Sequence, residues 1–164
     1  MGHARAQLGH VADGIALIHQ GIDTWVQIGQ RISVACYLTS LADAQLQAGA
    51  VNDALETVEQ GLNFNCEELV YRPETLRIRG ELRLKQGDLQ LVEADFRESI
   101  SLAYSMGAKA WELRTTMSLA RLLAQQDRSQ EARTKLAEIY NWFSEGFDTA
   151  DLKEAKALLD ELAT

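Results

Sequence analysis

The chain has 164 residues, about one domain, and its 46% hydrophobic and 24% charged residues are ordinary for a globular protein. No apolar run is long enough for a transmembrane helix, and the first ten residues lack the apolar core of a signal peptide. A formal net charge of −8 argues against a nucleic-acid-binding surface, and two cysteines do not make a secreted disulfide framework. These features predict a cytoplasmic protein with reduced thiols.

Apolar residues recur at helical spacing along the whole chain. Gly49 and Gly87 are typical helix ends, Asn52 or Asp53 is a candidate N-cap, and Pro73 suits the first turn of a helix. No segment alternates apolar and polar residues with a period of two, so no sheet is expected. The expected helices cover residues 11–28, 32–48, 53–65, 73–86, 90–105, 108–125, 130–143 and 149–162.

Three sets of residues repeat in register, with spacings of 40, 38 and 40 within each set. Every repeat begins with a small residue. A turn-forming residue follows seven positions later, and a third repeated position, mostly small, follows five positions after that. Any one set could arise by chance, but three sets in register indicate a solenoid of helical hairpins. The sets are Gly2, Ala42, Gly80 and Ala120; Gly9, Gly49, Gly87 and Asp127; and Gly14, Ala54, Val92 and Ala132.

The repeat predicts an all-α, right-handed α-α superhelix in which small residues lie where the two helices of a hairpin cross closely. The predicted hairpins cover about 1–28, 32–65, 73–106 and 108–143, in one domain spanning residues 1–164. The last helix, 149–162, has an apolar stripe and a charged outer face, which is typical of a helix that caps a solenoid. We expect the aromatic residues Trp142, Phe143 and Phe147 to pack beneath this helix.

The pattern resembles the tetratricopeptide repeat, most clearly from Leu41-Ala42 through Gly49 to Ala54-Leu55. That family's usual repeat is 34 residues, so a period of 38 to 40 implies longer helices. The resemblance is therefore closer to the long-repeat C-terminal regions of bacterial signalling ATPases and adenylate cyclase-like transcriptional regulators. Residues 111–122 look like the penultimate helix of those regions, and the tail segment 139–149, with 151–155 after it, carries the most specific part of the resemblance.

Charge is unevenly distributed, because residues 1–70 carry a net −6 while 72–85 carry +3 and 109–121 carry +2. Both positive segments are first helices of hairpins, which line the concave face in the family that the chain resembles. A basic groove of this kind would attract an acidic peptide segment. The alternative is that Glu74, Glu81 and Glu112 pair with these basic residues within the chain. The candidate groove residues are Arg77, Glu81, Lys85, Arg114, Met117 and Arg121.

The first hairpin looks incomplete, because its first small position is already Gly2. A shortened first helix would leave part of the second helix uncovered, and exposed apolar patches commonly mark interaction sites. We therefore expect the chain to be the C-terminal piece of a longer solenoid and to form a homodimer through its N-terminal hairpin. The candidate self-association residues are Ile15, Ile18, Ile22 and Trp25.

No catalytic constellation is evident. The sequence contains no phosphate-binding loop, and His3, His10 and His19 are not spaced as a helical metal pair. Cys36 and Cys66 are too few for a structural zinc site. We therefore predict no enzyme activity, no cofactor and no metal.

The predicted function is a protein-, peptide- or effector-binding module that serves as the regulatory arm of a signalling ATPase or nucleotide cyclase, with no nucleic-acid or membrane partner. The alternatives are a structural oligomerisation piece or a remnant enzyme.

Overall fold

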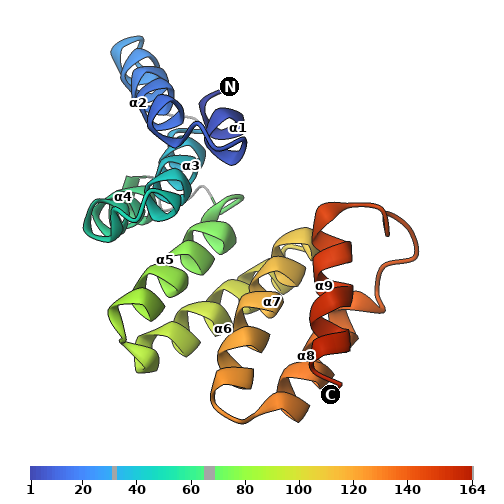
Figure 1. Ribbon diagram of the computed structural model, residues 1–164. Coiled ribbons are helices and arrows are strands. Elements are labelled where there is room, and N and C mark those ends of the chain that lie inside the picture. The colour runs from blue at the N-terminus through green and yellow to red at the C-terminus, as the bar shows by residue number, and fades with distance from the viewer. Residues whose placement is uncertain (31–32, 65–68, 164) are drawn as a thin grey trace.

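The computed structural model describes residues 1–30, 33–64 and 69–163, and within them the chain is built from α-helices joined by short connections, with no β-strand (Figure 1). The helices are α1 (Gly2–Gln7), α2 (Val11–Gln27), α3 (Val34–Gln47), α4 (Val51–Phe64), α5 (Arg72–Gln86), α6 (Leu89–Ser105), α7 (Lys109–Gln125), α8 (Ser129–Tyr140) and α9 (Ala150–Glu161).

The helices expected at 11–28, 90–105 and 108–125 are α2, α6 and α7, with ends within one residue of the prediction. The helix expected to run to residue 143 ends at Tyr140. Asn52 and Asp53 lie inside the first turn of α4, which begins at Val51, so neither is the N-cap. Cys66 and the end of the hairpin predicted for 32–65 lie outside the described residues.

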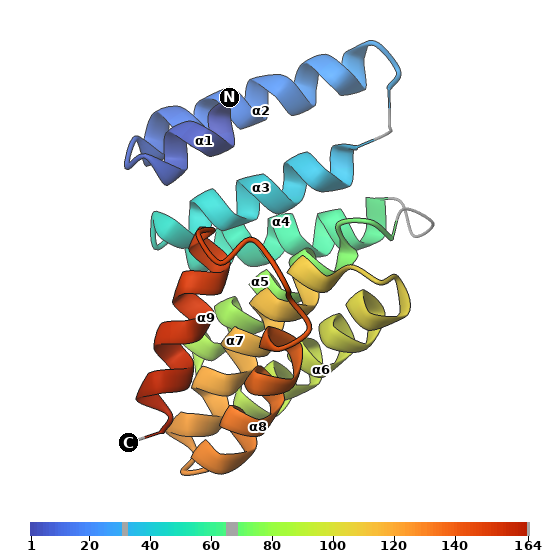
Figure 2. The same ribbon diagram turned by 90° about the vertical axis from the view of Figure 1, so that its right-hand side faces the viewer.

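Successive helices pack as antiparallel neighbours, and the odd-numbered helices also contact one another in the order α1, α3, α5, α7 and α9. Within the described residues, no comparable contacts join the even-numbered helices to one another. The molecule therefore has a first-helix layer, which we define as α1, α3, α5, α7 and α9, and an outer layer of α2, α4, α6 and α8. Figure 2 shows the resulting stack of hairpins, with α9 beside α7 at the C-terminal end.

The small residues of the repeat lie at the predicted crossings. A Cβ atom on Gly2 would come within 2.8 Å of the Gly14 carbonyl oxygen, and one on Gly14 would come equally close to the Gly2 oxygen. Ala42 and Ala54 are fully buried in one core cluster. In the third hairpin the group opposite Gly80 is the ring of Phe96, which lies one turn beyond the expected partner Val92.

The turn position of the repeat has one backbone conformation in all four hairpins. Gly9, Gly49, Gly87 and Asp127 have φ values of 91°, 76°, 84° and 61°. This left-handed region is open to glycine and is tolerated by aspartate better than by most residues. The replacement of glycine by Asp127 therefore preserves the turn.

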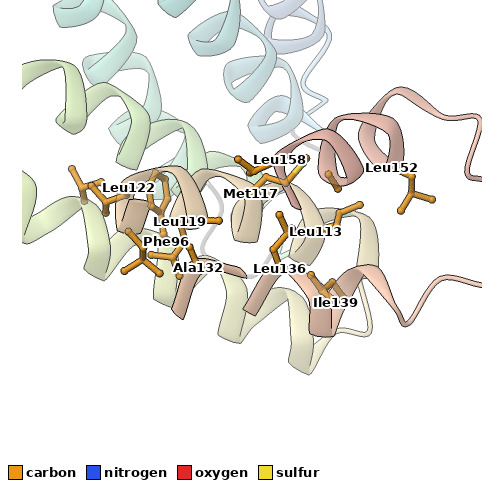
Figure 3. Packing of buried hydrophobic residues seen from close by; sticks show 14 residues of the cluster. Phe96, Leu113, Met117, Leu119, Leu122, Ala132, Leu136, Ile139, Leu152 and Leu158 are labelled. Carbon is orange, nitrogen blue, oxygen red and sulfur yellow. The ribbon is translucent and has the colours of Figure 1, made fainter. Parts of the chain in front are cut away.

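The largest core cluster lies at the C-terminal end, where α6, α7, α8 and α9 meet (Figure 3). Leu152, Ala155 and Leu158 bury the apolar stripe of α9 there, and its opposite face is exposed. The expectation for the aromatic residues was wrong in part. Phe143 packs against this core, but Trp142 and Phe147, which also lie in the loop between α8 and α9, are 59% and 47% exposed.

Gly80→Ala tests the close crossing of α5 and α6. The new Cβ would lie 2.5 Å from Cε1 of Phe96, whose ring is fully buried. We expect the overpacking cost of about 1–3 kcal/mol to exceed the gain in helix propensity, so the free energy of unfolding should fall. Urea denaturation of the wild type and the variant measures the difference.

Gly61→Ala is the matched control, because Gly61 also lies within a helix but its new Cβ would be 3.5 Å from Leu38 Cβ, an ordinary contact. This variant should gain about 0.5–1 kcal/mol from helix propensity. If both substitutions stabilised the chain, the α5–α6 crossing would be looser than described.

Candidate binding groove on the first-helix layer

A groove of about 500 Å³ runs along the first-helix layer, and every residue that lines it comes from α1, α3, α5, α7 or α9. This arrangement follows from the fold, because the odd-numbered helices contact one another and the outer helices lie behind them. We call this depression the concave groove. One face of each repeat thus contributes side chains to a single continuous surface.

Five of the six candidate groove residues line the concave groove, namely Arg77, Glu81, Arg114, Met117 and Arg121. The sixth, Lys85, is exposed in the last turn of α5 and is not part of the lining. Sequence analysis missed His3 and Asp43 on the N-terminal side, and Trp111, Asp151 and Glu154 on the C-terminal side.

The sequence did contain a signal for two of these missed residues. His3, Asp43, Glu81 and Arg121 are separated by 40, 38 and 40 residues, the same intervals as the structural positions of the repeat. All four line the concave groove. Extending the period from the small residues to the polar ones would therefore have identified the groove position in every hairpin.

Arg77 lies at the centre of the groove and is held by carboxylates of its own helix. Its guanidinium donates to Glu74 at 2.7 and 2.8 Å and also to Glu81, and its side chain is only 13% exposed. Burial alone would lower the pKa of Arg77, but the bonds to Glu74 and the nearby charges of Glu81 and Asp43 outweigh it and raise that pKa. Arg77 therefore stays charged and is bonded to carboxylates of its own helix, so its guanidinium is not free to bind a ligand.

The other two groove arginines are paired across to the capping helix. Arg114 donates to Asp151 at 2.7 Å and lies 5.2 Å from the centre of the Trp111 ring. Arg121 donates to Glu154 at 2.7 Å. These bonds join α7 to α9, so the same side chains that were expected to attract a partner fasten the C-terminal end of the solenoid.

The remaining positive charge of α5 faces away from the groove. Arg79 and Arg83 donate to Asp95 of α6 at 2.7 and 2.6 Å, and the Asp95 side chain is only 3% exposed. A buried carboxylate with two guanidinium partners is strongly destabilised if either partner is lost. Two of the five basic side chains of residues 72–85 thus join α5 to α6.

The prediction of a basic groove wall was wrong, and the alternative of pairing within the chain describes the groove arginines. Three arginines line the groove against five carboxylates, those of Asp43, Glu74, Glu81, Asp151 and Glu154, which gives a net charge of −2 with His3 neutral. The charge of single helices did not show this, because much of the acidic lining comes from α3 and α9. The groove therefore disfavours an acidic segment.

Asp43 differs from the other groove carboxylates in its partners. It accepts hydrogen bonds from the side-chain amides of Gln7 and Gln47, both at 2.9 Å, and lies 3.9 Å from His3 Nδ1. Burial raises its pKa, although Arg77 and His3 partly offset this effect. A carboxylate with a perturbed pKa in a concave surface is a candidate functional residue.

The predicted self-association stripe was also wrong in part. Ile18 is buried in the small core formed with Ala6 and Leu41, and Ile15 and Ile22 pack against the same core. The first helix of the next hairpin, α3, covers this face of α2. Of the four residues, Ile18 and Trp25 line an open depression, and the Trp25 ring lies 6.1 Å from that of Tyr37.

Neither a metal site nor a membrane span is indicated in the described part of the chain. No group of three or more metal-ligating side chains comes together among those residues. None of the helices in the same part is long and apolar enough to cross a bilayer.

Comparison with solved structures identifies the fold. Two structures of a putative kinesin light chain from Podosopora anserina, described as nearly identical TPR-like repeats and including one point variant, superpose with a TM-score of 0.71. Each match covers 98% of this chain and 81% of the other, at 16% sequence identity. The fold is TPR-like. No family model matches the sequence, and no curated protein does.

The TPR-like assignment confirms the predicted fold class and the predicted resemblance to tetratricopeptide repeats. The concave groove is the surface on which the first helices of such repeats present their side chains.

Asp43→Asn tests the electrostatic environment of the groove. Because its pKa is raised, the folded chain holds the Asp43 proton more tightly than the unfolded chain, so the free energy of unfolding falls as the pH rises above the ordinary value of 3.8 and through the folded pKa. Asparagine carries no charge, and its oxygen can still accept from Gln7 and Gln47.

We therefore expect Asp43→Asn to raise the melting temperature at pH 7, and the difference to disappear below a pH of about 3.8. Calorimetry across this pH range measures both effects. A lower melting temperature for the variant at neutral pH would show that Asp43 is a stabilising ion-pair partner and not a costly one.

Proposed function

We propose that the chain is a non-catalytic interaction module whose concave groove binds a protein segment that carries basic and apolar side chains. The observation that carries this proposal is the net charge of −2 over a groove of about 500 Å³ in which all three arginines are already bonded to carboxylates. An incoming cation meets carboxylate oxygens that have remaining acceptor capacity, whereas an incoming anion must displace an internal partner.

The groove also offers apolar contact. Trp111 is half-buried in its lining, with the Tyr71 ring 6.1 Å away and Arg114 against it. Met117 and Ile78 form a buried apolar base beside it. A fixed aromatic side chain among carboxylates suits a segment in which a basic residue lies next to an aliphatic or aromatic one.

We further propose that the module, acting as one repeat domain over residues 1–164, is the regulatory arm of a bacterial cytoplasmic signalling ATPase or nucleotide cyclase. This proposal rests on the resemblance of residues 111–122 and 139–149 to the C-terminal regions of those regulators. In the structure residues 111–122 lie in α7, which lines the concave groove, whereas residues 139–149 form the end of α8 and the loop before α9 and do not line it. The proposed partner segment would then signal to the ATPase by occupying the groove.

Selection from a random peptide library tests the groove. Peptides retained by the wild-type chain should be enriched in lysine and arginine, and their affinity should fall as salt is raised, because exposed charge pairs are screened. Enrichment in aspartate and glutamate would contradict the proposal.

Two double variants test whether a selected peptide binds in the concave groove. Asp43→Asn with Glu154→Gln removes two groove carboxylates, and each change should weaken binding of a selected peptide by about two- to fivefold. Glu145→Gln with Asp148→Asn makes the same change in net charge at exposed positions outside the lining and should leave the affinity unchanged. Equal effects from both pairs would indicate non-specific attraction. Titration calorimetry of the folded variants makes the comparison.

A further inference from the structure

A second depression of about 410 Å³ lies at the N-terminal end, where residues 1–3, α2 from Leu17 to Trp25, and Tyr37 and Ser40 of α3 line it. The six residues of α1 pack along only part of the 17-residue α2. Gly2 packs against Gly14 and Ile18, so α1 covers the front of α2 and does not reach Gly21. Figure 2 shows α1 beside only one end of α2. We call this depression the α2 groove.

The equivalent position is covered in the later hairpins. Gly61 and Ser99 follow Gly21 at the repeat intervals of 40 and 38 residues. A Cβ on Gly61 would contact Leu38 of the preceding helix and Thr75 of the following one. Ser99 is fully buried, donates to the Pro73 carbonyl at 2.7 Å and lies 2.8 Å from the Thr115 hydroxyl. In both of these hairpins, helices therefore pack over this position.

The α2 groove has the shape of a helix-packing site. Leu17, Gly21 and Thr24 follow one another at helical spacing along its floor. Leu17 is 39% exposed, and nothing lies within 4 Å of the position where a Gly21 side chain would begin. Trp25 and Tyr37 form an aromatic wall beside them. The exposed Leu17 side chain, a knob, thus lies one helical turn from the open space above Gly21, a hole.

We propose that the α2 groove is filled by α2 of a second copy of this chain. Two α2 helices related by a two-fold axis would place Leu17 of each copy in the space above Gly21 of the other, which is the reciprocal contact of an isologous dimer. Small residues let helices approach closely, as at the Gly2–Gly14 crossing within the chain.

Charge favours the same occupant. The chain carries −8, so two copies repel each other over most of their surfaces. The residues that line the α2 groove include no Asp, Glu, Lys or Arg. Two copies therefore meet little repulsion between charged side chains when these faces touch.

Light scattering combined with size-exclusion chromatography tests the proposal on the chain as it is. The wild type should show a mass that rises toward twice the monomer value as concentration increases. Gly21→Gln fills the hole without changing charge, and Leu17→Gln removes the knob. Each should weaken association by at least about tenfold.

Ala16→Gln is the matched control, because Ala16 is exposed on the same helix but does not line the α2 groove. It should dimerise like the wild type. Circular dichroism verifies that all variants are folded, which the open space at Gly21 permits. A wild type that stays monomeric at every accessible concentration overturns the proposal, as does a dimer that tolerates both Gly21→Gln and Leu17→Gln. Peptide binding by the concave groove is measured separately and should survive in Gly21→Gln.

Discussion

The close crossing of two helices at a small residue is the constraint on which the rest of the structure depends. Each hairpin folds because a glycine or alanine allows its backbones to approach, and a left-handed residue such as Gly49 or Asp127 turns the chain back. Repetition at nearly constant intervals then stacks the first helices side by side. The concave groove follows from this stacking, since it is lined wholly by the first-helix layer.

Electrostatics adds a second level of organisation to the stack. Arginines join neighbouring helices, through Asp95 between α5 and α6 and through Asp151 and Glu154 between α7 and α9. These bonds pair four of the eight basic side chains that the sequence places in α5 and α7. What remains in the groove is an excess of carboxylate, with Asp43 held where burial opposes its ionisation. A residue that costs stability within a concave surface is consistent with a binding role.

The sequence predicted the fold well because its determinants are periodic. Helix positions, turn positions and the Gly2–Gly14 crossing follow from spacing alone. The charge of the groove could not be predicted from single helices, because Arg114 and Arg121 find partners 37 and 33 residues away. The burial of Ile18 was not predicted, because only α1 was considered as a cover for α2. In the structure α3, from the next hairpin, covers the same face of α2. Trp142 and Phe147 were misplaced because they lie in a loop whose path no periodicity determines.

The proposed binding face is the first-helix layer. Amide NMR spectra recorded while a selected lysine-containing peptide is titrated into the chain locate the binding face. Binding in the concave groove should produce shift changes in α3, α5, α7 and α9 around Asp43, Arg77, Trp111 and Glu154, with α4, α6 and α8 little affected. Changes concentrated on the outer layer would contradict it.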